Sequence, residues 1–148
     1  PTQNMGMLGL MEDKRNQMGL SFRSKGDMIY LIGKSREDIS SSEYLYNYHK
    51  VKQSPAPYFD LDEELAVQKI VSKLIASSLV LSAHDISDGG LFITLLESAM
   101  SNNFGFDIPT DAEIRTDAFL FGASQGRIVV SVSPSPEAAF VDFMLQQN

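Results

Sequence analysis

The chain has 148 residues, 43% of them hydrophobic, which suits one domain with a buried core. Its 19 acidic and 12 basic side chains give a net charge of -7, so it repels nucleic-acid phosphates and anionic lipids on average, and we expect neither a nucleic-acid nor a membrane partner. The absence of cysteine excludes disulfides, thiolate catalysis and cysteine-ligated zinc, and it fits a cytoplasmic protein.

The first 18 residues are interpreted as a junction from a preceding domain, and residues 19–148 as the domain itself. The apolar run Met5–Met11 is interrupted by Gly6 and Gly9, as in a strand whose backbone is closely approached. Because the sequence opens on proline and not on methionine, we expect the chain to begin inside a larger polypeptide.

Residues 28–32, MIYLI, are apolar throughout and rich in strand formers. This pattern predicts a strand covered on both faces, and therefore a sheet with helices on both sides. The following residues 33–35, GKS, resemble the end of a phosphate-binding P-loop, but Met28 stands where that motif requires glycine, so the motif is rejected.

Two capping boxes predict two helices. Ser40 and Glu43 open a short one through residue 46, and Asp60 and Glu63 repeat the spacing before a longer one. The longer helix has an apolar face made by Leu61, Leu65, Val67, Ile70, Val71, Leu74 and Ile75. Its acidic first turn could suggest a metal site, but the helix dipole favours carboxylates there without any ligand. We predict no metal site.

The second half of the chain alternates between the two patterns. Residues 79–86, 104–108 and 127–132 are predicted as strands, and residues 89–100 and 136–146 as helices. Alternation of this kind predicts a layered domain of the α/β or α+β class.

The stretch SAHDISDGGLF, residues 82–92, joins a predicted strand to a predicted helix. The start of a helix offers free N–H groups to an anion, and Gly89 and Gly90 would let a ligand approach closely. Asp85 and Asp88 would repel a bare phosphate unless Mg²⁺ lay between them, so the ligand would be a metal-nucleotide or a cationic, hydroxyl-rich molecule. The ligand-binding candidates are His84, Asp85, Ser87, Asp88, Gly89 and Gly90.

A purely structural interpretation accounts for most of the same pattern. In it, Ser87 or Asp88 caps the helix, the two glycines permit tight packing of the helix on the sheet, and His84 is hydrogen-bonded in the corner. His49 is expected at a helix end or on the surface. Arg127 is either an edge residue or a charge aimed along its strand at a neighbour, and the sequence leaves both possibilities open.

Three blocks, DMIYLIGKSREDISSSEYL, SAHDISDGGLFITLLESAM and LFGASQGRIVVSV, closely resemble the carboxy-terminal half of the formylglycinamide ribonucleotide amidotransferases, also called phosphoribosylformylglycinamidine synthases. These enzymes belong to the aminoimidazole ribonucleotide synthetase superfamily, whose core has two tandem pairs of amino-type and carboxy-type domains. The block from His84 to Leu91 resembles that of the second copy. The resemblance implies a carboxy-type domain with a layered α/β/α sandwich.

The resemblance also implies a reaction for the whole enzyme in purine biosynthesis. ATP, with Mg²⁺, phosphorylates the amide oxygen of formylglycinamide ribonucleotide, and glutamine-derived ammonia then displaces phosphate to give the amidine. The catalytic histidine, the main magnesium ligands and the ATP contacts of the family lie in the amino-type domains. No catalytic residue is therefore assigned to this chain, and the isolated chain is expected to be inactive. Implied partners are the other core domains, a glutaminase domain or subunit, and a small bridging subunit.

Two departures from the family pattern bear on the role of this domain. Ser40 and Ser41 stand where the family often has two glycines, and Ala123 replaces a glutamate that is common before Ser124 and Gln125. The second departure favours a structural or nucleotide-holding role over a catalytic one. The family also continues past the position of Asn148, so the last part of the domain is expected to be missing.

Two alternative functions are consistent with the sequence. The domain could be a structural and interaction module whose loop binds nothing, or the parent could be another ATP-dependent member of the superfamily, such as a hydrogenase-maturation or thiamin-phosphate kinase relative.

Overall fold

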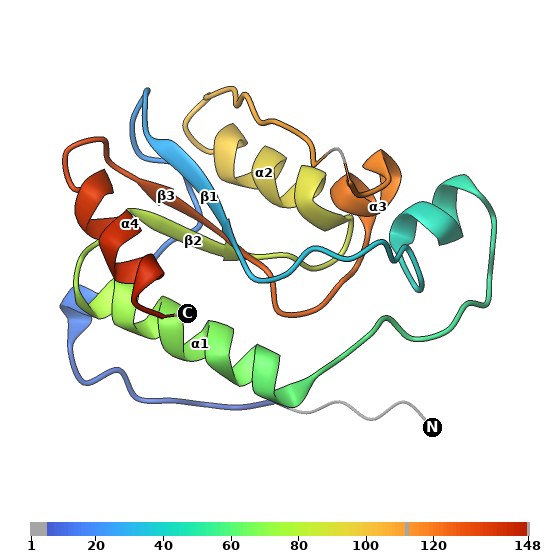
Figure 1. The fold of residues 1–148 in the computed structure, drawn as a ribbon, viewed down its shortest axis with the longest axis horizontal. Coiled ribbons are helices and arrows are strands. Elements are labelled where there is room, and N and C mark those ends of the chain that lie inside the picture. The colour runs from blue at the N-terminus through green and yellow to red at the C-terminus, as the bar shows by residue number, and fades with distance from the viewer. Residues whose placement is uncertain (1–5, 112, 148) are drawn as a thin grey trace.

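A computed structural model describes residues 6–111 and 113–147 of the chain. A small sheet lies between two layers of helices (Figure 1). The elements in chain order are the 3₁₀ turn η1 (Lys14–Asn16), β1 (Met28–Ile32), the π-helical turn η2 (Tyr44–Tyr48), α1 (Leu61–Ala76), β2 (Ser82–Asp85), α2 (Gly90–Met100), α3 (Thr116–Phe121), β3 (Ile128–Val132) and α4 (Glu137–Leu145).

The sheet has the strand order β1-β3-β2, and both pairings are antiparallel. In β1, Met28 lies opposite Val132, whereas in β2, Ser82 lies opposite Ser131. The strands β1 and β2 therefore run in the same direction on either side of β3. This arrangement makes β3, which lies within the strand predicted at residues 127–132, the central strand, and it leaves β1 at an edge.

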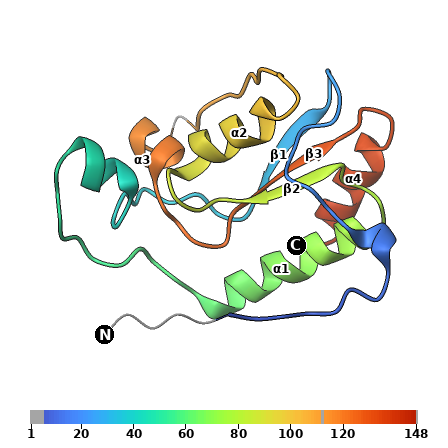
Figure 2. The same cartoon turned by 180° about the vertical axis from the view of Figure 1, so that it is seen from behind.

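The two faces of the sheet carry separate apolar cores. On one face α1 and α4 pack on the sheet, and the core there includes Leu74, Phe140, Val130 and Val132. On the other face α2 packs with α3, and Val129 of β3 joins that second core. Alternate side chains of β3 therefore pack into opposite layers. Figure 2, the view from behind, shows the same α/β/α layering that the sequence predicted.

The helix α1 is capped as predicted, because Asp60 Oδ1 accepts hydrogen bonds from the backbone N–H groups of Asp62 and Glu63. Its predicted apolar face is only partly correct. Leu61 is 69% exposed and Leu65 is 44% exposed, since the first two turns extend beyond the edge of the core.

Residues 104–108 do not form the predicted strand. Their alternation is real, because Phe104, Phe106 and Ile108 are half-buried against the core of α2 while the residues between them are exposed. Among the described residues no strand pairs with this segment, so the alternating pattern is present without a hydrogen-bonded ladder.

The prediction for Met5–Met11 is wrong over residues 6–11, which form no strand, while Met5 lies outside the described residues. Met7, Leu8 and Leu10 are each more than 90% exposed. The full two-sided burial predicted for residues 28–32 is also not observed, because β1 is an edge strand and Met28 is 43% exposed.

The short helix predicted from Ser40 is the π-helical turn η2, and Ser40 does not cap it. Instead Ser42 Oγ accepts a hydrogen bond from the Leu45 N–H at 3.2 Å. Ser41, at a position where glycine was noted as common, has a φ of 54°, in the left-handed region that glycine favours. The short helix α3 had no sequence prediction. Within the described part of the chain, no helix has both the length and the apolar character needed to cross a bilayer.

Candidate functional site

The loop between β2 and α2, together with the residue on either side of it, holds all the predicted ligand-binding residues except His84. Asp85, Ser87 and Asp88 are exposed, while Ile86 is buried and its N–H donates to the Arg127 carbonyl at 2.9 Å. That bond ties the base of the loop to β3 and leaves the polar side chains on the surface.

Both glycines of this loop are required by the backbone. Gly89 has a φ of 86° and Gly90 a φ of 73°, which L-residues with side chains rarely adopt. A Cβ at Gly90 would lie 2.7 Å from the Leu120 carbonyl oxygen and 2.7 Å from Phe121 Cα. The tight packing expected from the glycine pair is therefore present, but it is against the end of α3 and not against the sheet.

The capping role predicted for Ser87 or Asp88 is wrong. The N-cap of α2 is Gly89, and no side chain accepts a hydrogen bond there. The first turn of α2 thus keeps N–H groups without a side-chain partner, at the positive end of the helix dipole. Chemically, this arrangement suits an acceptor-rich ligand, and Asp88 beside it would require that ligand to carry a cation.

The structure separates His84 from the rest of the candidates. Its Nδ1 lies 3.2 Å from Ser98 Oγ, and its Nε2 lies 3.4 Å from Glu97 Oε2. Ser98 is eight residues after Gly90, or about 12 Å along the helix axis. The imidazole is therefore held against the far half of α2. The structural interpretation was right that His84 is hydrogen-bonded, but wrong in placing that bond in the corner between strand and helix.

Aromatic rings surround the start of α2, and the sequence analysis did not identify this cluster. Phe92 lies 5.8 Å from Phe121, and Tyr44 stacks on Phe121 at 5.1 Å between ring centroids. Tyr48 continues the stack on Tyr44, and the exposed His49 packs edge-on against both tyrosines, as expected for a histidine at a helix end. The repeated tyrosines at positions 44, 46 and 48 were the available signal.

Arg127 is not an edge residue, because it leads into the central strand β3, and its guanidinium is directed at neighbouring backbone carbonyls. Its side chain is only 2% exposed and donates from Nη2 to the Gly122 carbonyl at 2.8 Å and from Nε to the Ser124 carbonyl at 3.3 Å. Burial lowers the pKa of Arg127 to about 10. Its role is to hold the loop 122–126, which carries Gln125, against the start of β3.

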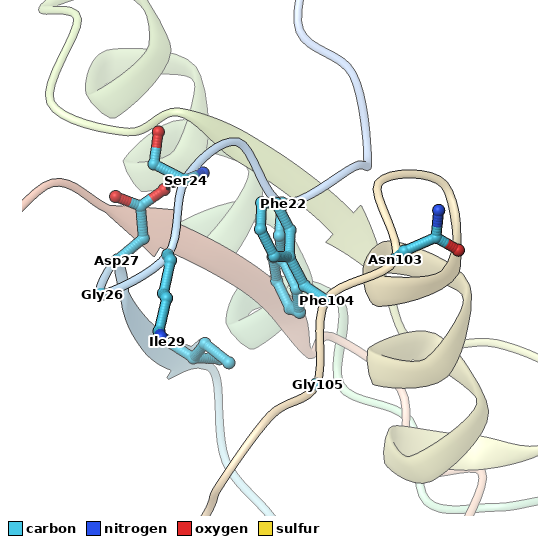
Figure 3. Close-up of a pocket in the computed structure, with 9 residues that line it drawn as sticks. Phe22, Ser24, Gly26, Asp27, Ile29, Asn103, Phe104 and Gly105 are labelled. Atoms are coloured by element: carbon cyan, nitrogen blue, oxygen red, sulfur yellow. Dashed lines mark hydrogen bonds between the residues drawn. The ribbon is translucent and has the colours of Figure 1, made fainter.

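Two surface hollows lie away from this loop. The first, of about 320 Å³, is formed between residues 22–29 and residues 103–105 (Figure 3). Phe22 and Phe104 line its apolar part, while Asp27 lies in a turn closed by a bond from the Ser24 N–H. The second, of about 330 Å³, lies between α1 and residues 33–36. Neither is lined by the predicted ligand-binding residues.

The described residues contain no group of three or more histidine or acidic side chains placed to hold a metal ion. The loop by itself therefore supplies two exposed carboxylates and a helix start, but not a complete coordination shell.

The fold and the sequence define a carboxy-type domain of the synthetase superfamily. Residues 24–148 match the family model described as AIR synthase related protein, C-terminal domain, and the chain belongs to this family. The whole chain is 37% identical to the phosphoribosylformylglycinamidine synthase subunit PurL of Moorella thermoacetica, and it is 41% identical over 154 aligned positions to the subunit of that name from Salinibacter ruber. Both alignments cover all of this chain but 20% of the relative, so the chain spans a fifth of the length of these proteins.

Solved structures agree on the fold. Thermotoga maritima PurL complexed with FGAR superimposes with a TM-score of 0.74 at 16% identity, covering 90% of this chain and 24% of that one. The PurLQS structure from the same organism gives a TM-score of 0.66 at 16% identity, covering 90% and 22%. The resemblance seen in the sequence is thus confirmed for the family and the layered fold.

Proposed function

We propose that residues 1–148 are part of an ATP-dependent enzyme of purine biosynthesis that converts formylglycinamide ribonucleotide to its amidine with glutamine-derived ammonia. The observation that carries this proposal is the 37% identity over the entire chain to a phosphoribosylformylglycinamidine synthase subunit. The similar Thermotoga maritima proteins were solved in complexes with FGAR and with ATP, which supports the same ligands for the parent of this chain. The compartment would be the cytoplasm.

No bond-making step is assigned to this chain. In the proposed enzyme ATP, with Mg²⁺, supplies the phosphoryl group, and its main contacts would come from other domains. The six candidate residues include no nucleophile with an activating base beside it, because His84 is held by Ser98 and Glu97 on α2. The isolated chain is therefore expected to be inactive, and any turnover by residues 1–148 alone would contradict this.

The test of the reaction uses the intact parent protein, ammonia, formylglycinamide ribonucleotide and ATP, with release of ADP as the readout. We expect ADP release that depends on the ribonucleotide. A folded, complete parent that releases no ADP would contradict the reaction and leave only the fold, in which case another ATP-dependent member of the superfamily becomes the better candidate.

For the domain itself we infer a non-catalytic nucleotide site lined by Ser87, Asp88, Gly89 and Gly90. Asp85 lies beside it, whereas His84 acts as a structural residue. The uncapped start of α2 supports acceptance of phosphate oxygens, and Asp88 supports a cation between protein and nucleotide. The aromatic rings of Phe92 and Tyr44 would lie at the border of this site.

The nucleotide site is tested with Asp88→Ala in the intact parent. The variant should lose bound nucleotide or thermal stability more than it loses turnover rate. Asp62→Ala is the matched control, because Asp62 is also an exposed aspartate in a helix start but is far from the loop along the chain. Unchanged nucleotide content and melting temperature in Asp88→Ala would favour the alternative of a structural module that binds nothing.

We propose that residues 1–18 form a junction from a preceding domain and that residues 19–148 form the domain itself. Met7, Leu8 and Leu10 are almost fully exposed, and apolar side chains in such a run suit contact with another domain. Further proposed partners are the other core domains, a glutaminase domain or subunit, and a small bridging subunit.

A further inference from the structure

The loop between β2 and α2 contains a dipeptide whose chemistry differs from that of every other pair in the sequence. Asp88 precedes Gly89, and no second aspartate or asparagine of the chain is followed by glycine. An aspartate before glycine can close into a cyclic imide, because the glycine nitrogen has no neighbouring side chain that hinders its attack on the aspartyl carboxyl. This pair is therefore the position in the chain at which ring closure meets the least steric resistance.

The folded structure leaves both reacting groups accessible. The side chain of Asp88 is exposed, and Gly89 is half-buried. The two residues lie in a turn that is closed by a hydrogen bond from the Gly90 N–H to the Ser87 carbonyl at 3.1 Å. Within the described residues the Gly89 N–H itself donates no backbone hydrogen bond. The nitrogen therefore loses no backbone acceptor when it attacks.

Asp85, three residues earlier at the end of β2, provides the contrast. Its side chain is also exposed, but the next residue is the buried Ile86, whose N–H donates to the Arg127 carbonyl at 2.9 Å. Attack by that nitrogen would break a bond to the start of β3 and would bring a β-branched side chain against the forming ring. The two aspartates are alike in exposure, and they differ in the residue that supplies the nitrogen.

We propose that the bond between Asp88 and Gly89 is a site of spontaneous aspartate isomerisation in the folded protein. The Gly89 nitrogen attacks the protonated side-chain carboxyl of Asp88, an N–C bond replaces a C–O bond, and the amide proton leaves with the hydroxyl as water. Water then opens the cyclic imide. Opening at the side-chain carbonyl restores aspartate, whereas opening at the main-chain carbonyl leaves isoaspartate. The inference does not rest on the proposed enzymatic function.

The isomer changes the backbone directly before α2. Isoaspartate adds one carbon to the main chain ahead of Gly89 and leaves the free carboxylate on the former main-chain carbonyl carbon. Gly90 is packed closely against α3, since an added Cβ would lie 2.7 Å from the Leu120 carbonyl oxygen. The extra length therefore loosens either the turn of residues 87–90 or the contact between α2 and α3, and the folded protein loses stability.

The test is incubation of the intact longer protein under native conditions, followed by peptide mapping that separates isoaspartate from aspartate at each position. We expect isoaspartate to accumulate at residue 88, with an intermediate that is lighter by one water, while Asp85 stays unmodified. Methyl transfer from S-adenosylmethionine by an isoaspartyl methyltransferase measures the same product. Accumulation only after unfolding in urea would overturn the proposal, because the folded loop would then keep the two groups from reacting. Equal accumulation at both aspartates would overturn it too.

Two substitutions separate this reaction from other changes during incubation. Asp88→Glu keeps the carboxylate but requires a larger ring, so position 88 should stay unmodified. Asp88→Asn should isomerise faster than the native protein, because the side-chain amide is attacked without prior protonation. Incubation should lower the melting temperature of the native protein and leave that of Asp88→Glu unchanged. An equal loss in both would contradict the effect on α2, and isomerisation of Asp88→Asn at or below the native rate would contradict attack by the Gly89 nitrogen.

Discussion

The hydroxyl oxygens of Ser82 and Ser131 lie 2.6 Å apart between β2 and β3, and both side chains are buried, with 1% and 0% exposure. The two residues are also direct partners in the strand register. Because the surrounding sheet is apolar, each hydroxyl depends on the other for a side-chain hydrogen bond.

Removal of either hydroxyl alone should be destabilising, because the other hydroxyl then stays buried without its side-chain partner. Ser131→Ala leaves the Ser82 hydroxyl buried without its partner, which we expect to lower the free energy of unfolding by about 1–3 kcal/mol. The double variant Ser82→Ala with Ser131→Ala should cost less than the sum of the two single variants. Urea unfolding of the four proteins measures the coupling, and additive losses would show that the pair contributes no stabilising bond.

Local patterns predicted the elements whose contacts are local. The helix α1 and its Asp60 cap, the helix α2 and the central strand β3 all follow from short-range periodicity, and each is present within a few residues of its predicted position. The same patterns located the loop of Asp85 to Gly90 at the end of a strand. For residues 104–108 the same patterns predicted a strand that is not present, although Phe104, Phe106 and Ile108 pack against the core.

The remaining features depend on contacts between distant segments. The direction of the Arg127 side chain is set by the carbonyls of Gly122 and Ser124, which come near it only when loop 122–126 folds back. His84 is separated from the start of α2 because its imidazole contacts Ser98, which lies 14 residues later in the chain on the second half of that helix. The absence of a Ser87 or Asp88 cap follows from the left-handed turn at Gly89, which the packing of Gly90 against α3 imposes.

The packing of α2 on α3 predicts a large effect at Gly90. Gly90→Ala should lower the free energy of unfolding by about 2–4 kcal/mol, because left-handed strain adds to a clash with the backbone of Phe121. Gly26→Ala separates the two causes, since Gly26 has a φ of 91° but no atom within 4 Å of its added Cβ. That control should cost about 1 kcal/mol. If Gly90→Ala and Gly26→Ala lost the same unfolding free energy in chemical denaturation, the clash of the added Cβ with α3 would contribute nothing.

The end of α1 predicts a stabilising substitution. Ser78 has a φ of 54°, its N–H donates to the Ile75 carbonyl, and the Leu79 N–H donates to the Leu74 carbonyl, which together form a Schellman motif. Ser78→Gly should raise the free energy of unfolding by about 0.5–1 kcal/mol, because glycine adopts this conformation without strain.

The neighbouring residue is the control for that substitution. Ser77 has a φ of -87°, where glycine gains nothing, so Ser77→Gly should lower the free energy of unfolding by about 0.5–1 kcal/mol. Both changes are measured from the midpoints of urea unfolding, compared between proteins whose unfolding free energies depend on urea with the same slope. If both glycine variants shifted the midpoint in the same direction, the claim that glycine relieves left-handed strain at Ser78 would be contradicted.

The contact between β1 and α4 predicts a pH dependence at the edge of the sheet. The Tyr30 hydroxyl donates to Glu137 Oε1 at 2.6 Å, and this bond, with burial and the carboxylate charge, raises the pKa of Tyr30 above its ordinary value of 10.0. Above pH 10 the folded protein therefore retains a proton that the unfolded chain releases. The resulting stabilisation is fully present below the unfolded pKa and is lost as the pH rises through the folded one.

Tyr30→Phe removes the titrating group and tests this dependence. The difference in unfolding free energy between the native protein and Tyr30→Phe should be constant from pH 7 to 9 and should shrink as the pH rises above 10. Glu137→Gln keeps an acceptor but removes the charge, so Tyr30 should then ionise at a lower pH in a spectrophotometric titration. A stability difference that stays constant through the alkaline range would show that the Tyr30 proton is not held by Glu137.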